Sequence, residues 1–505
     1  MSKIINLNKL ALILKKHRKQ KKIVLCHGVF DVLHHGHIKY FEEAKKSGDI
    51  LVVSLTADEF VNKGPGRPYF NFKFRSETLE AIQTIDYICK SKFDTSLEVI
   101  KLLKPDFYCK GMDYKNKKKD LTKNIFLEKK AVEKNGGKFI TTSSKLFSSS
   151  NIINSKLDFF TEEQKRSVSK IKKISNFNKI VSDINNLKNK KILVIGEVII
   201  DEYVFCDALG KSGKEPFLAL KKNRVERYLG GSGAIAMHLR DFVKQIDILS
   251  YKGESTKDNN FIKSKIGNKI KFHSFNKEGS PTIVKRRYIE ENERRKLLGV
   301  YTFNDAEINK TCEKKILNFL DKKINNYDCI IVADYGHGLI NSKIAQKIVS
   351  KAKFCSLNAQ INAANIGHHS LEKYKNLDCV IINLNELKHE MRSRNKNFLP
   401  IGRKLIKKMN IDNLIVTMGR AGAALLNKSR LSYSVAPSFA RDIVDKVGAG
   451  DCLFALLSLF LSSKINSEVS LFLASIAAGK NVEIVGNSNY LDRVEFLKTV
   501  DHSLK

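Results

Sequence analysis

The 505-residue chain contains no tryptophan and only 7 prolines. A scarcity of proline, together with frequent β-branched residues, argues against long disordered segments. The nine cysteines are scattered, without the Cys-x-x-Cys pattern of a zinc site or the paired spacing of a disulfide framework. We therefore expect reduced thiols that are mostly buried.

Long apolar runs are also missing from the sequence. The longest, CLFALLSLFL from Cys452, falls well short of the ~20 residues that cross a bilayer. The N-terminal residues show no signal-peptide cleavage pattern. These observations predict a cytoplasmic protein that does not bind membranes.

Acidic residues are outnumbered, with 53 Asp and Glu against 90 Lys and Arg, and the formal charge is +37. A charge of this size suits a nucleic-acid binder, whose affinity for a duplex would fall steeply with salt. However, the lysines are spread along the whole chain, and only the segment from Lys115 to Asp120 resembles a basic patch. Charge runs are mostly solvated surface, so we expect no nucleic-acid partner.

The length of the chain exceeds what one hydrophobic core supports, so two or more domains are expected. Apolar runs that end in glycine-containing turns, KKIVLCHGVFD from Lys21 and KKILVIGEVIID from Lys190, are typical of the first strand of an α/β domain. Alternating apolar and helical segments follow both runs, which predicts mainly parallel sheets flanked by helices. We predict an α/β chain with domains of residues 1–157 and 190–505, joined by a helical linker of residues 158–189.

Three histidines, His34, His35 and His37, follow the first of these predicted strands. The start of a helix offers free N–H groups and a positive dipole end, which bind phosphate. His34 and His37 lie three residues apart on one helical face, so both rings can donate to phosphate oxygens, while His35 faces elsewhere. A zinc site is less favoured because no glutamate base or third ligand is visible. A buried structural histidine remains the alternative for either residue taken alone.

The segment GVFDVLHHGH resembles the signature of the HxGH nucleotidyltransferase superfamily, and the similarity runs from about Lys21 to about Asn154. It is closest to the cytidylyltransferase-like group, because RPYFNFKFRSETLEAI, KPDFYCKGMDY and SSSNII follow in that group's order. The resemblance implies a Rossmann-like fold in which His34 and His37 clamp the triphosphate and no covalent protein nucleophile is needed. Further nucleotide-binding or phosphate-binding positions that it implies are Gly28, Phe30, Lys45, Lys46, Ser148, Ser149 and Ser150.

A second glycine-rich turn lies in DKVGAGDCLFALL, where Asp451 stands beside the N–H groups of Gly448, Ala449 and Gly450. At a helix start this arrangement is an anion cradle with a carboxylate inside it. An ordinary helix cap is the alternative for this motif taken alone.

The residues from about Lys190 onward resemble the PfkB/ribokinase family of sugar kinases, through GEVIIDEY, YLGGSGAIAMHL, VADYGHG, NLNE, VTMGRAG and DKVGAGD. The resemblance implies a ribokinase-like fold that uses ATP and Mg²⁺, with Asp451 as the base that takes a proton from a sugar hydroxyl and the glycine turn as the anion hole. Other positions that it implies are Asp201, Gly230 and Gly231 for the sugar, Lys285 and Arg287 for a substrate phosphate, Asn383 and Glu386 for magnesium, and Thr417 and Gly419 for the nucleotide.

Both halves resemble the bifunctional heptose-phosphate kinase/adenylyltransferase, although the transferase half comes first here. The family usually has Asn where this chain has Ala234, and a DPK-like turn at residues 358–360, and such changes alter which sugar hydroxyls are paired. We predict a bifunctional enzyme for surface polysaccharide precursors. Its kinase half phosphorylates a sugar or sugar phosphate, such as heptose 7-phosphate, from ATP. Its transferase half joins a sugar 1-phosphate to a nucleotide from ATP or CTP and releases pyrophosphate.

In the alternative hypothesis, the kinase half has lost catalysis and acts as a sugar-phosphate sensor for an active transferase. Ala234 and Asn358 favour this alternative, whereas Asp451 with its glycine turn counts against it. Both hypotheses expect small-molecule partners, a sugar phosphate and a nucleoside triphosphate. The oligomeric state, monomer or homodimer, is left open.

Overall fold

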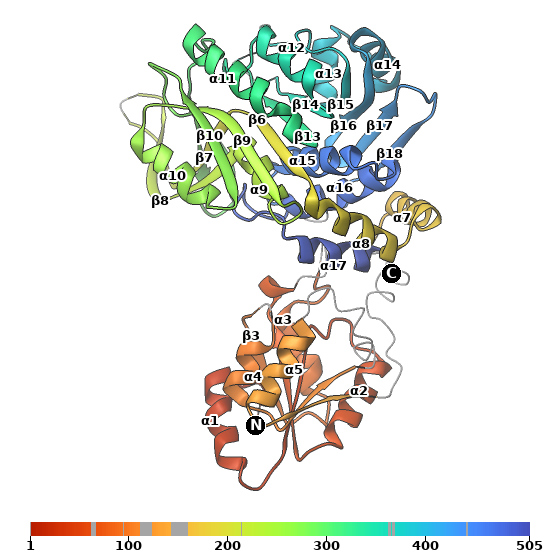
Figure 1. Cartoon of the computed structure of the whole chain (residues 1–505). Coiled ribbons are helices and arrows are strands. Elements are labelled where there is room, and N and C mark those ends of the chain that lie inside the picture. Colours follow the sequence, from red (N-terminus) through yellow and green to blue (C-terminus); the bar gives the residue numbers. More distant parts are fainter. Residues whose placement is uncertain are drawn as a thin grey trace. The chain divides into compact units, whose positions relative to one another are not determined.

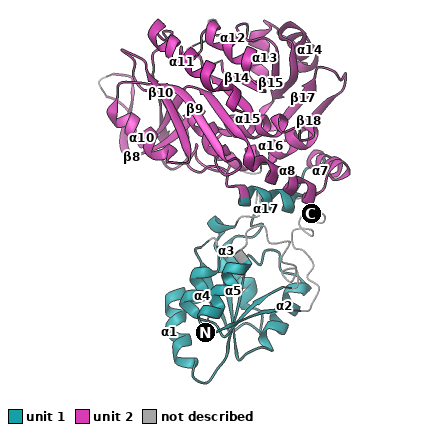
Figure 2. Cartoon of the chain, in the orientation of Figure 1, with its two compact units in different colours: residues 1–162, 494–505 teal, residues 163–493 magenta. Residues whose placement is uncertain are grey.

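The computed structural model describes residues 2–61, 67–93, 95–111, 124–142, 160–213, 215–361, 365, 369–440 and 443–504. Packing divides the chain into two units, one of Met1–Glu162 with Val494–Lys505 and the other of Glu163–Arg493 (Figure 2). Both units are α/β, as the sequence predicts.

The first unit is built on a five-stranded sheet in the order β3-β2-β1-β4-β5, and every neighbouring pair is parallel. The strands are β1 (Ile23–Gly28), β2 (Ile50–Thr56), β3 (Tyr87–Ser91), β4 (Phe107–Lys110) and β5 (Lys138–Thr141). The helices are α1 (Leu7–His17), α2 (His35–Lys45), the 3₁₀ turn η1 (Asp58–Phe60), α3 (Phe72–Glu80), α4 (Leu97–Leu103), α5 (Asn124–Lys134) and, near the end of the chain, α17 (Arg493–Ser503).

This sheet is buried on both faces because successive strand residues point in opposite directions. Val24 and Cys26 pack into one apolar cluster with residues of α2 and α3. Ile23 and Leu25 pack into the other cluster, with residues of α1, α4 and α5. The strand order reverses between β1 and β4, and a reversal of this kind opens a crevice at the carboxyl ends of the two strands.

The second unit contains a nine-stranded sheet in the order β10-β9-β6-β13-β14-β15-β16-β17-β18. The pairs from β10 to β16 are parallel, and β17 and β18 continue the sheet in antiparallel fashion. The strands are β6 (Lys191–Gly196), β9 (Gln245–Lys252), β10 (Ile270–Asn276), β13 (Cys329–Asp334), β14 (Cys355–Ala359), β15 (Leu377–Asn383), β16 (Ile411–Thr417), β17 (Ala423–Asn427) and β18 (Tyr433–Ala436).

Helices cover both faces of this sheet, with α11, α12, α13 and α14 on one side and α9, α15 and α16 on the other (Figure 1). The helices are α9 (Ser232–Leu239), α10 (Thr256–Ile266), α11 (Lys310–Lys323), the 3₁₀ turn η5 (Ile324–Asn326), α12 (Ser342–Lys351), α13 (Leu384–Glu390), α14 (Phe398–Met409), the 3₁₀ turn η6 (Gly419–Ala421), α15 (Ala449–Ser462) and α16 (Ser467–Asn481). Every residue of α15 from Cys452 to Phe460 is buried, so the apolar run that stood out in the sequence is a core helix.

A separate four-stranded sheet has the order β12-β11-β7-β8. Its strands are β7 (Val198–Lys211), β8 (Leu218–Gly231), β11 (Val284–Glu290) and β12 (Lys296–Thr302). The first part of β7 is buried and its last residues are exposed. The buried part carries Asp201, one of the residues predicted to bind the sugar. The buried end of this sheet therefore lies at a candidate site.

The segment that the sequence marks as a linker forms two helices, α7 (Glu162–Ile174) and α8 (Phe177–Asn186), and the 3₁₀ turn η4 (Leu187–Asn189). Helix α7 packs on the second unit, because Gln164 donates to the carbonyl of Ser438 at 2.6 Å and Lys170 pairs with Glu468 at 2.9 Å. All nine cysteines are buried and free, as expected. None of the helices in the described ranges is long and apolar enough to span a membrane.

Candidate active sites

In the first unit, His34 and His37 meet at the start of α2. His34 is the N-cap residue, and its Nδ1 accepts from the N–H of Gly36 at 3.1 Å. The N–H of His34 in turn donates to Nδ1 of His37 at 3.4 Å, and the two rings stack with centroids 4.1 Å apart. Because both Nδ1 atoms accept, each neutral ring carries its proton on Nε2 and can donate it to an anion. His35 is exposed and takes no part in this pair.

The turn before α2 is held in an uncommon backbone conformation. Phe30 and Val32 have φ values of 46° and 48°, in the left-handed region. A Cβ on Gly28 would lie 3.1 Å from the Phe30 ring, so a glycine suits that position. The Phe30 ring meets the His37 ring edge to face at 5.7 Å, which ties this turn to the histidine pair.

Two buried charged residues that the sequence analysis did not single out fasten this turn. Asp31 accepts from the N–H groups of Tyr69 and Phe70 at 2.7 and 3.0 Å. The Arg75 guanidinium donates to the carbonyls of Phe70, Val29 and Thr56 and to the carboxylate of Asp58, at 2.9, 2.6, 2.9 and 2.6 Å. Both residues lie in segments that carry the family resemblance. The sequence did not indicate that they are buried, and their burial is what reveals their structural role.

Lys45 and Lys46 are not brought to the histidines. Lys45 is the last residue of α2, about 15 Å along the helix from its start. Its ammonium pairs with Asp86 at 2.5 Å and donates to the carbonyl of Asp49 at 2.7 Å. Lys46 is the exposed C-cap. The resemblance implied that Lys45 or Lys46 adds positive charge at the phosphates, but both lie at the end of α2 away from the histidines. Ser148, Ser149 and Ser150 lie outside the described residues.

A further polar cluster lies at the carboxyl ends of β1 and β4. His27 follows Cys26 on β1, whose Cα partner on β4 is Cys109, so His27 and Lys110 are the next residues on the two strands. Lys110 lies 3.6 Å from Glu128, and both side chains are almost fully buried. Burial lowers the pKa of His27 to about 3, so this ring stays neutral near pH 7. Its Nδ1 lies 3.2 Å from the Ser54 hydroxyl.

In the second unit, the glycine-rich turn begins α15. Gly448 is the N-cap with φ of 86°, and a Cβ there would lie 2.0 Å from Oδ1 of Asn487. Gly450 is exposed, and a Cβ there would meet nothing within 4 Å. The first N–H groups of a helix, here from Ala449 onward, have no partner within the helix and bind anions. The turn therefore has the form of the expected cradle.

Asp451 lies at this cradle with three polar neighbours from other elements. Its Oδ1 accepts from the hydroxyl of Tyr335 at 2.9 Å. Burial raises the pKa of Asp451 to about 7, and the nearby charge of Asp201 adds to this rise. The hydrogen bond from Tyr335 and the charge of Lys285 oppose it. A carboxylate that titrates near neutral pH is suited to act as a general base.

The predicted sugar-side residues come together around Asp201. Arg287 donates to its Oδ1 at 2.5 Å, and Lys285 is its direct partner across β7 and β11. A Cβ on Gly230 would lie 2.2 Å from Oδ2 of Asp201, and a Cβ on Gly231 would lie 2.4 Å from the carbonyl of Glu197. Gly230 therefore lets β8 approach the Asp201 carboxylate closely, and Gly231 lets it approach the backbone of Glu197. Burial lowers the pKa of Lys285, and Asp201 opposes this shift.

The loop after β13, residues 335–339, is held by two buried carboxylates, Glu197 and Asp334. Glu197 accepts from the N–H groups of Tyr335, His337 and Leu339 at 3.0, 3.2 and 3.4 Å. Burial raises its pKa to about 7, and nearby Asp334 adds to the shift.

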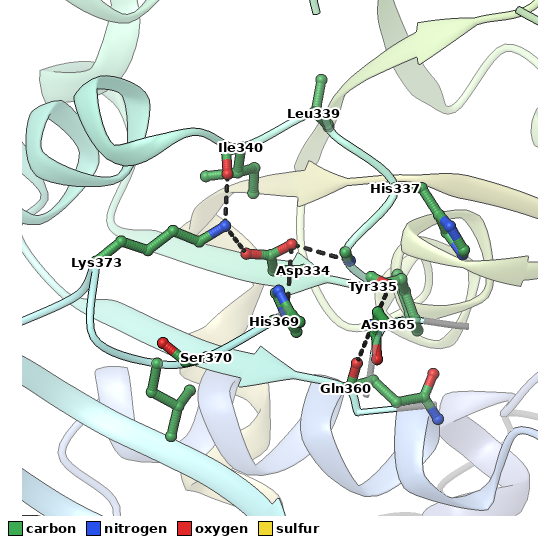
Figure 3. A network of polar contacts seen from close by, with 12 residues as sticks. Asp334, Tyr335, His337, Leu339, Ile340, Gln360, Asn365, His369, Ser370 and Lys373 are labelled. Carbon is green, nitrogen blue, oxygen red and sulfur yellow. Dashed lines mark hydrogen bonds and ion pairs between the residues drawn. The ribbon is translucent and has the colours of Figure 1, made fainter. Parts of the chain in front are cut away.

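Asp334 is the centre of the polar network in Figure 3. It pairs with Lys373 at 2.7 Å and accepts from the N–H of Gly336 at 3.1 Å. Burial raises the pKa of Asp334, but Lys373 and His369 outweigh it and the net shift is downward. The segment VADYGHG carries part of the family resemblance, but no role was predicted for its residues from the sequence.

Asn383 and Glu386 form a reciprocal capping box at the start of α13. Each side chain accepts from the backbone N–H of the other residue at 2.8 Å. Burial raises the pKa of Glu386 to about 7, and only backbone N–H groups oppose the shift. A divalent cation would supply the missing positive partner, and Mg²⁺ needs only one or two carboxylates beside waters and phosphate oxygens. The donor set therefore fits magnesium. In the described residues, no group of three or more His, Cys, Asp or Glu side chains forms a preassembled metal cage.

The remaining predicted positions are placed as follows. Thr417 ends β16, and Gly419 follows it in the turn η6 with φ of 60°. Ala234, where the family usually has Asn, is fully buried in α9. Asn358, at the end of β14, donates to the carbonyl of Ile381 on β15 at 2.8 Å, so its amide joins two strands.

The second unit is thus an α/β kinase-like domain with a carboxylate in an anion cradle, and two family models match the chain. The model described as cytidylyltransferase-like covers residues 25–156, and the model described as pfkB family carbohydrate kinase covers residues 189–492. The second match spans more than half of the sequence. The chain belongs to the pfkB family of carbohydrate kinases.

Similar curated proteins carry the name Bifunctional protein HldE. The protein of a Nitratiruptor species is 28% identical over 301 residues, which are 59% of this chain and 62% of that protein. The protein of Campylobacter jejuni (strain RM1221) is 24% identical over 320 residues, which are 62% of this chain and 66% of that protein. The chain thus spans less than two thirds of the length of these relatives.

Solved structures show the same fold as the second unit. Phosphofructokinase-2 from Escherichia coli, in complex with potassium, matches with a TM-score of 0.52 at 12% identity, over 62% of this chain and 99% of that one. Ribokinase from Giardia lamblia matches with a TM-score of 0.50 at 14% identity, over 62% of this chain and all of that one. This likeness confirms the predicted ribokinase-like fold.

Proposed function

We propose that the chain is a bifunctional sugar-activating enzyme of the cytoplasm. The kinase half transfers a phosphoryl group from ATP to a sugar or sugar phosphate resembling heptose 7-phosphate. The transferase half joins a sugar 1-phosphate to the nucleotide of ATP or CTP and releases pyrophosphate. The observation that carries the proposal is that one chain holds two anion-binding helix starts, His34 with His37 at α2 and Asp451 with its glycine turn at α15.

In the kinase half, Asp451 takes the proton of a sugar hydroxyl, whose oxygen then attacks the γ-phosphorus while ADP leaves. The N–H groups at the start of α15 receive the transferred phosphoryl group. Asp201, held by Arg287 at 2.5 Å, orients the sugar, and Lys285 supports the substrate charge. Thr417 and Gly419 lie on the nucleotide side. Magnesium, when bound, neutralises phosphate charge, and Asn383 and Glu386 are the residues that would hold it.

In the transferase half, an oxygen of the sugar phosphate attacks the α-phosphorus and pyrophosphate leaves. The attacking group is already an anion, so the protein needs to position two anions and stabilise the developing charge rather than to supply a base. His34 and His37 donate to phosphate oxygens through Nε2. Gly28 and Phe30 shape the turn that holds these rings.

The experiment follows both reactions by phosphorus NMR with the full-length chain. One sample contains ATP, Mg²⁺ and D-glycero-D-manno-heptose 7-phosphate, and a second contains the heptose 1-phosphate with either CTP or ATP. We expect a new anomeric phosphate signal in the first sample and pyrophosphate with a nucleotide sugar in the second. Asp451→Asn should abolish only the first reaction, and His37→Ala should abolish only the second.

Matched variants control for general damage. Asp321→Asn changes an exposed carboxylate that pairs with Lys347, and His35→Ala changes the exposed histidine beside the pair. Neither should affect its reaction. One outcome would favour the sensor alternative over the kinase proposal. In it, both the unaltered chain and Asp451→Asn transfer nucleotides and bind the heptose phosphate, but neither phosphorylates it.

A further inference from the structure

The Tyr335 hydroxyl forms the hydrogen bond to Asp451 described above, at 2.9 Å to Oδ1. Because this bond uses Oδ1, Oδ2 is the carboxylate oxygen that can accept a proton from a substrate. A carboxylate that rotates about its side-chain bonds would present either oxygen and would spend little time in a productive orientation. The direction of the Tyr335 bond therefore bears on catalysis.

Tyr335 is itself held firmly. Its exposed fraction is 3%, its N–H donates to Glu197, and Asn365 donates to its carbonyl at 3.0 Å. The next residue, Gly336, is fixed by Asp334, and Figure 3 shows Tyr335 beside Asn365 where the loop leaves β13. A ring fixed on its backbone side defines where its hydroxyl lies, so it can set the position of a partner rather than follow it.

We propose that Tyr335 is a positioning residue of the kinase site, whose hydroxyl holds the Asp451 carboxylate so that Oδ2 faces the acceptor hydroxyl of the substrate. The proposal rests on the proposed role of Asp451 as the base. It adds a residue that acts on the reaction through the base.

The same bond tunes the acidity of Asp451. The charged and titratable groups that face Asp451 are Asp201 from β7, Lys285 from β11 and Tyr335 after β13, and Cys452 follows it on its own helix. Lys285 lies 5.6 Å from the centre of the Tyr335 ring. A hydrogen bond donated to a carboxylate favours its ionised form, so loss of the hydroxyl leaves burial and Asp201 opposed only by Lys285.

The test compares Tyr335→Phe with the unaltered full-length chain by following the carboxyl ¹³C resonance of Asp451 against pH, assigned by its loss in Asp451→Asn. We expect the titration midpoint to rise by about one to two pH units, as the loss of a hydrogen bond to a charged group implies. With an active substrate, kcat at pH 6 should fall about 10-fold to 100-fold while KM for ATP stays unchanged. An unchanged midpoint overturns the proposal.

Tyr327→Phe is the matched control. Tyr327 is also buried and donates to a carboxylate, Asp247, at 2.8 Å. Asp247 lies near the beginning of β9, two strands away in the sheet order from β13, the strand that leads into Tyr335. This variant should leave the Asp451 midpoint in place. A shift of equal size in Tyr327→Phe would mean a global effect and would overturn the proposal.

A second measurement needs no change at Tyr335. In the unaltered chain, the ¹³Cζ resonance of Tyr335 should move with the midpoint of Asp451, and this movement should vanish in Asp451→Asn. A Tyr335 resonance insensitive to that midpoint contradicts the proposal even if Tyr335→Phe does not fold. Both titrations are made without substrate, so absence of kinase activity would count against the proposed function and not against this inference.

Discussion

The two candidate sites place different acid–base groups at the same structural position, the start of a helix in a parallel α/β unit. At α2 the groups are two stacked histidines whose Nδ1 atoms accept from backbone N–H groups. At α15 the group is a carboxylate whose pKa burial raises to about 7. The proposed reactions explain the difference, because a sugar phosphate attacks as an anion whereas a sugar hydroxyl must first lose a proton.

The two units also differ in the direction of their carboxylate pKa shifts. In the first unit, the pKa values of Glu42, Glu80 and Glu128 are lowered. Around the kinase site, burial raises the pKa values of Glu197, Glu386 and Asp451 to about 7, whereas Lys373 and His369 hold the pKa of Asp334 below its usual value. Three buried carboxylates of the kinase site are therefore kept in an unfavourable setting, which is common where an enzyme needs a base.

The largest expected effect separates the two reactions. Asp451→Asn removes the base, and general base catalysis contributes about 10²-fold to 10⁴-fold, so we expect the kinase rate to fall by about that factor. The transferase rate should be unchanged, because that reaction uses no base from this unit. Steady-state assays of both reactions on one preparation check this, and an equal loss in both would break the comparison.

The second effect concerns the stability of the histidine turn. Arg75→Met leaves three carbonyls and Asp58 without the guanidinium that now joins them. We expect a loss of about 3 kcal/mol in the free energy of unfolding of the first unit, with loss of transferase activity and an unaltered kinase. Urea unfolding followed by circular dichroism measures it. Lys73→Met, on the exposed side of the same helix, should cost far less.

The third effect compares two glycines of the kinase cradle. Gly448→Ala forces a Cβ to within 2.0 Å of Asn487 at a φ of 86°, so we expect a cost of about 1–3 kcal/mol and a reduced kinase rate. Gly450→Ala meets nothing within 4 Å and should leave the thermal unfolding temperature almost unchanged. Equal unfolding temperatures for the two variants would contradict this account of the turn.

Motifs with a short, ordered spacing were sufficient to predict the local backbone geometry at both candidate sites. GVFDVLHHGH predicts the helix start that brings His34 and His37 together, and DKVGAGD predicts the glycine turn beside Asp451. Both depend on contacts within about one helical turn, which spacing alone determines. The predicted parallel sheets follow in the same way from buried apolar runs.

Contacts between distant segments could not be predicted in this way. Tyr335 reaches Asp451 across 116 residues of sequence, and nothing in VADYGHG indicates which atom its hydroxyl meets. Lys45 shows the converse error, because its proximity in sequence to the histidines hid the length of the helix between them. Burial, which gives Glu197 and Arg75 their importance, is likewise a property of the assembled fold.

The smallest effect is the dependence of stability on pH. The folded pKa of Asp451 is raised to about 7, whereas an unfolded Asp titrates near 4. Between these values the folded chain binds more protons than the unfolded chain, so the stability of the second unit falls as pH rises from about 4 to about 7. Asp451→Asn removes this contribution and should be more stable than the unaltered chain at pH 8 by about 1–2 kcal/mol, with little difference near pH 4. Urea unfolding at several pH values measures the gap, with Asp321→Asn as the control. If the difference in the free energy of unfolding does not grow with pH, ionised Asp451 does not destabilise the folded chain. The contrast between the two sites would then be supported only by their proposed reactions.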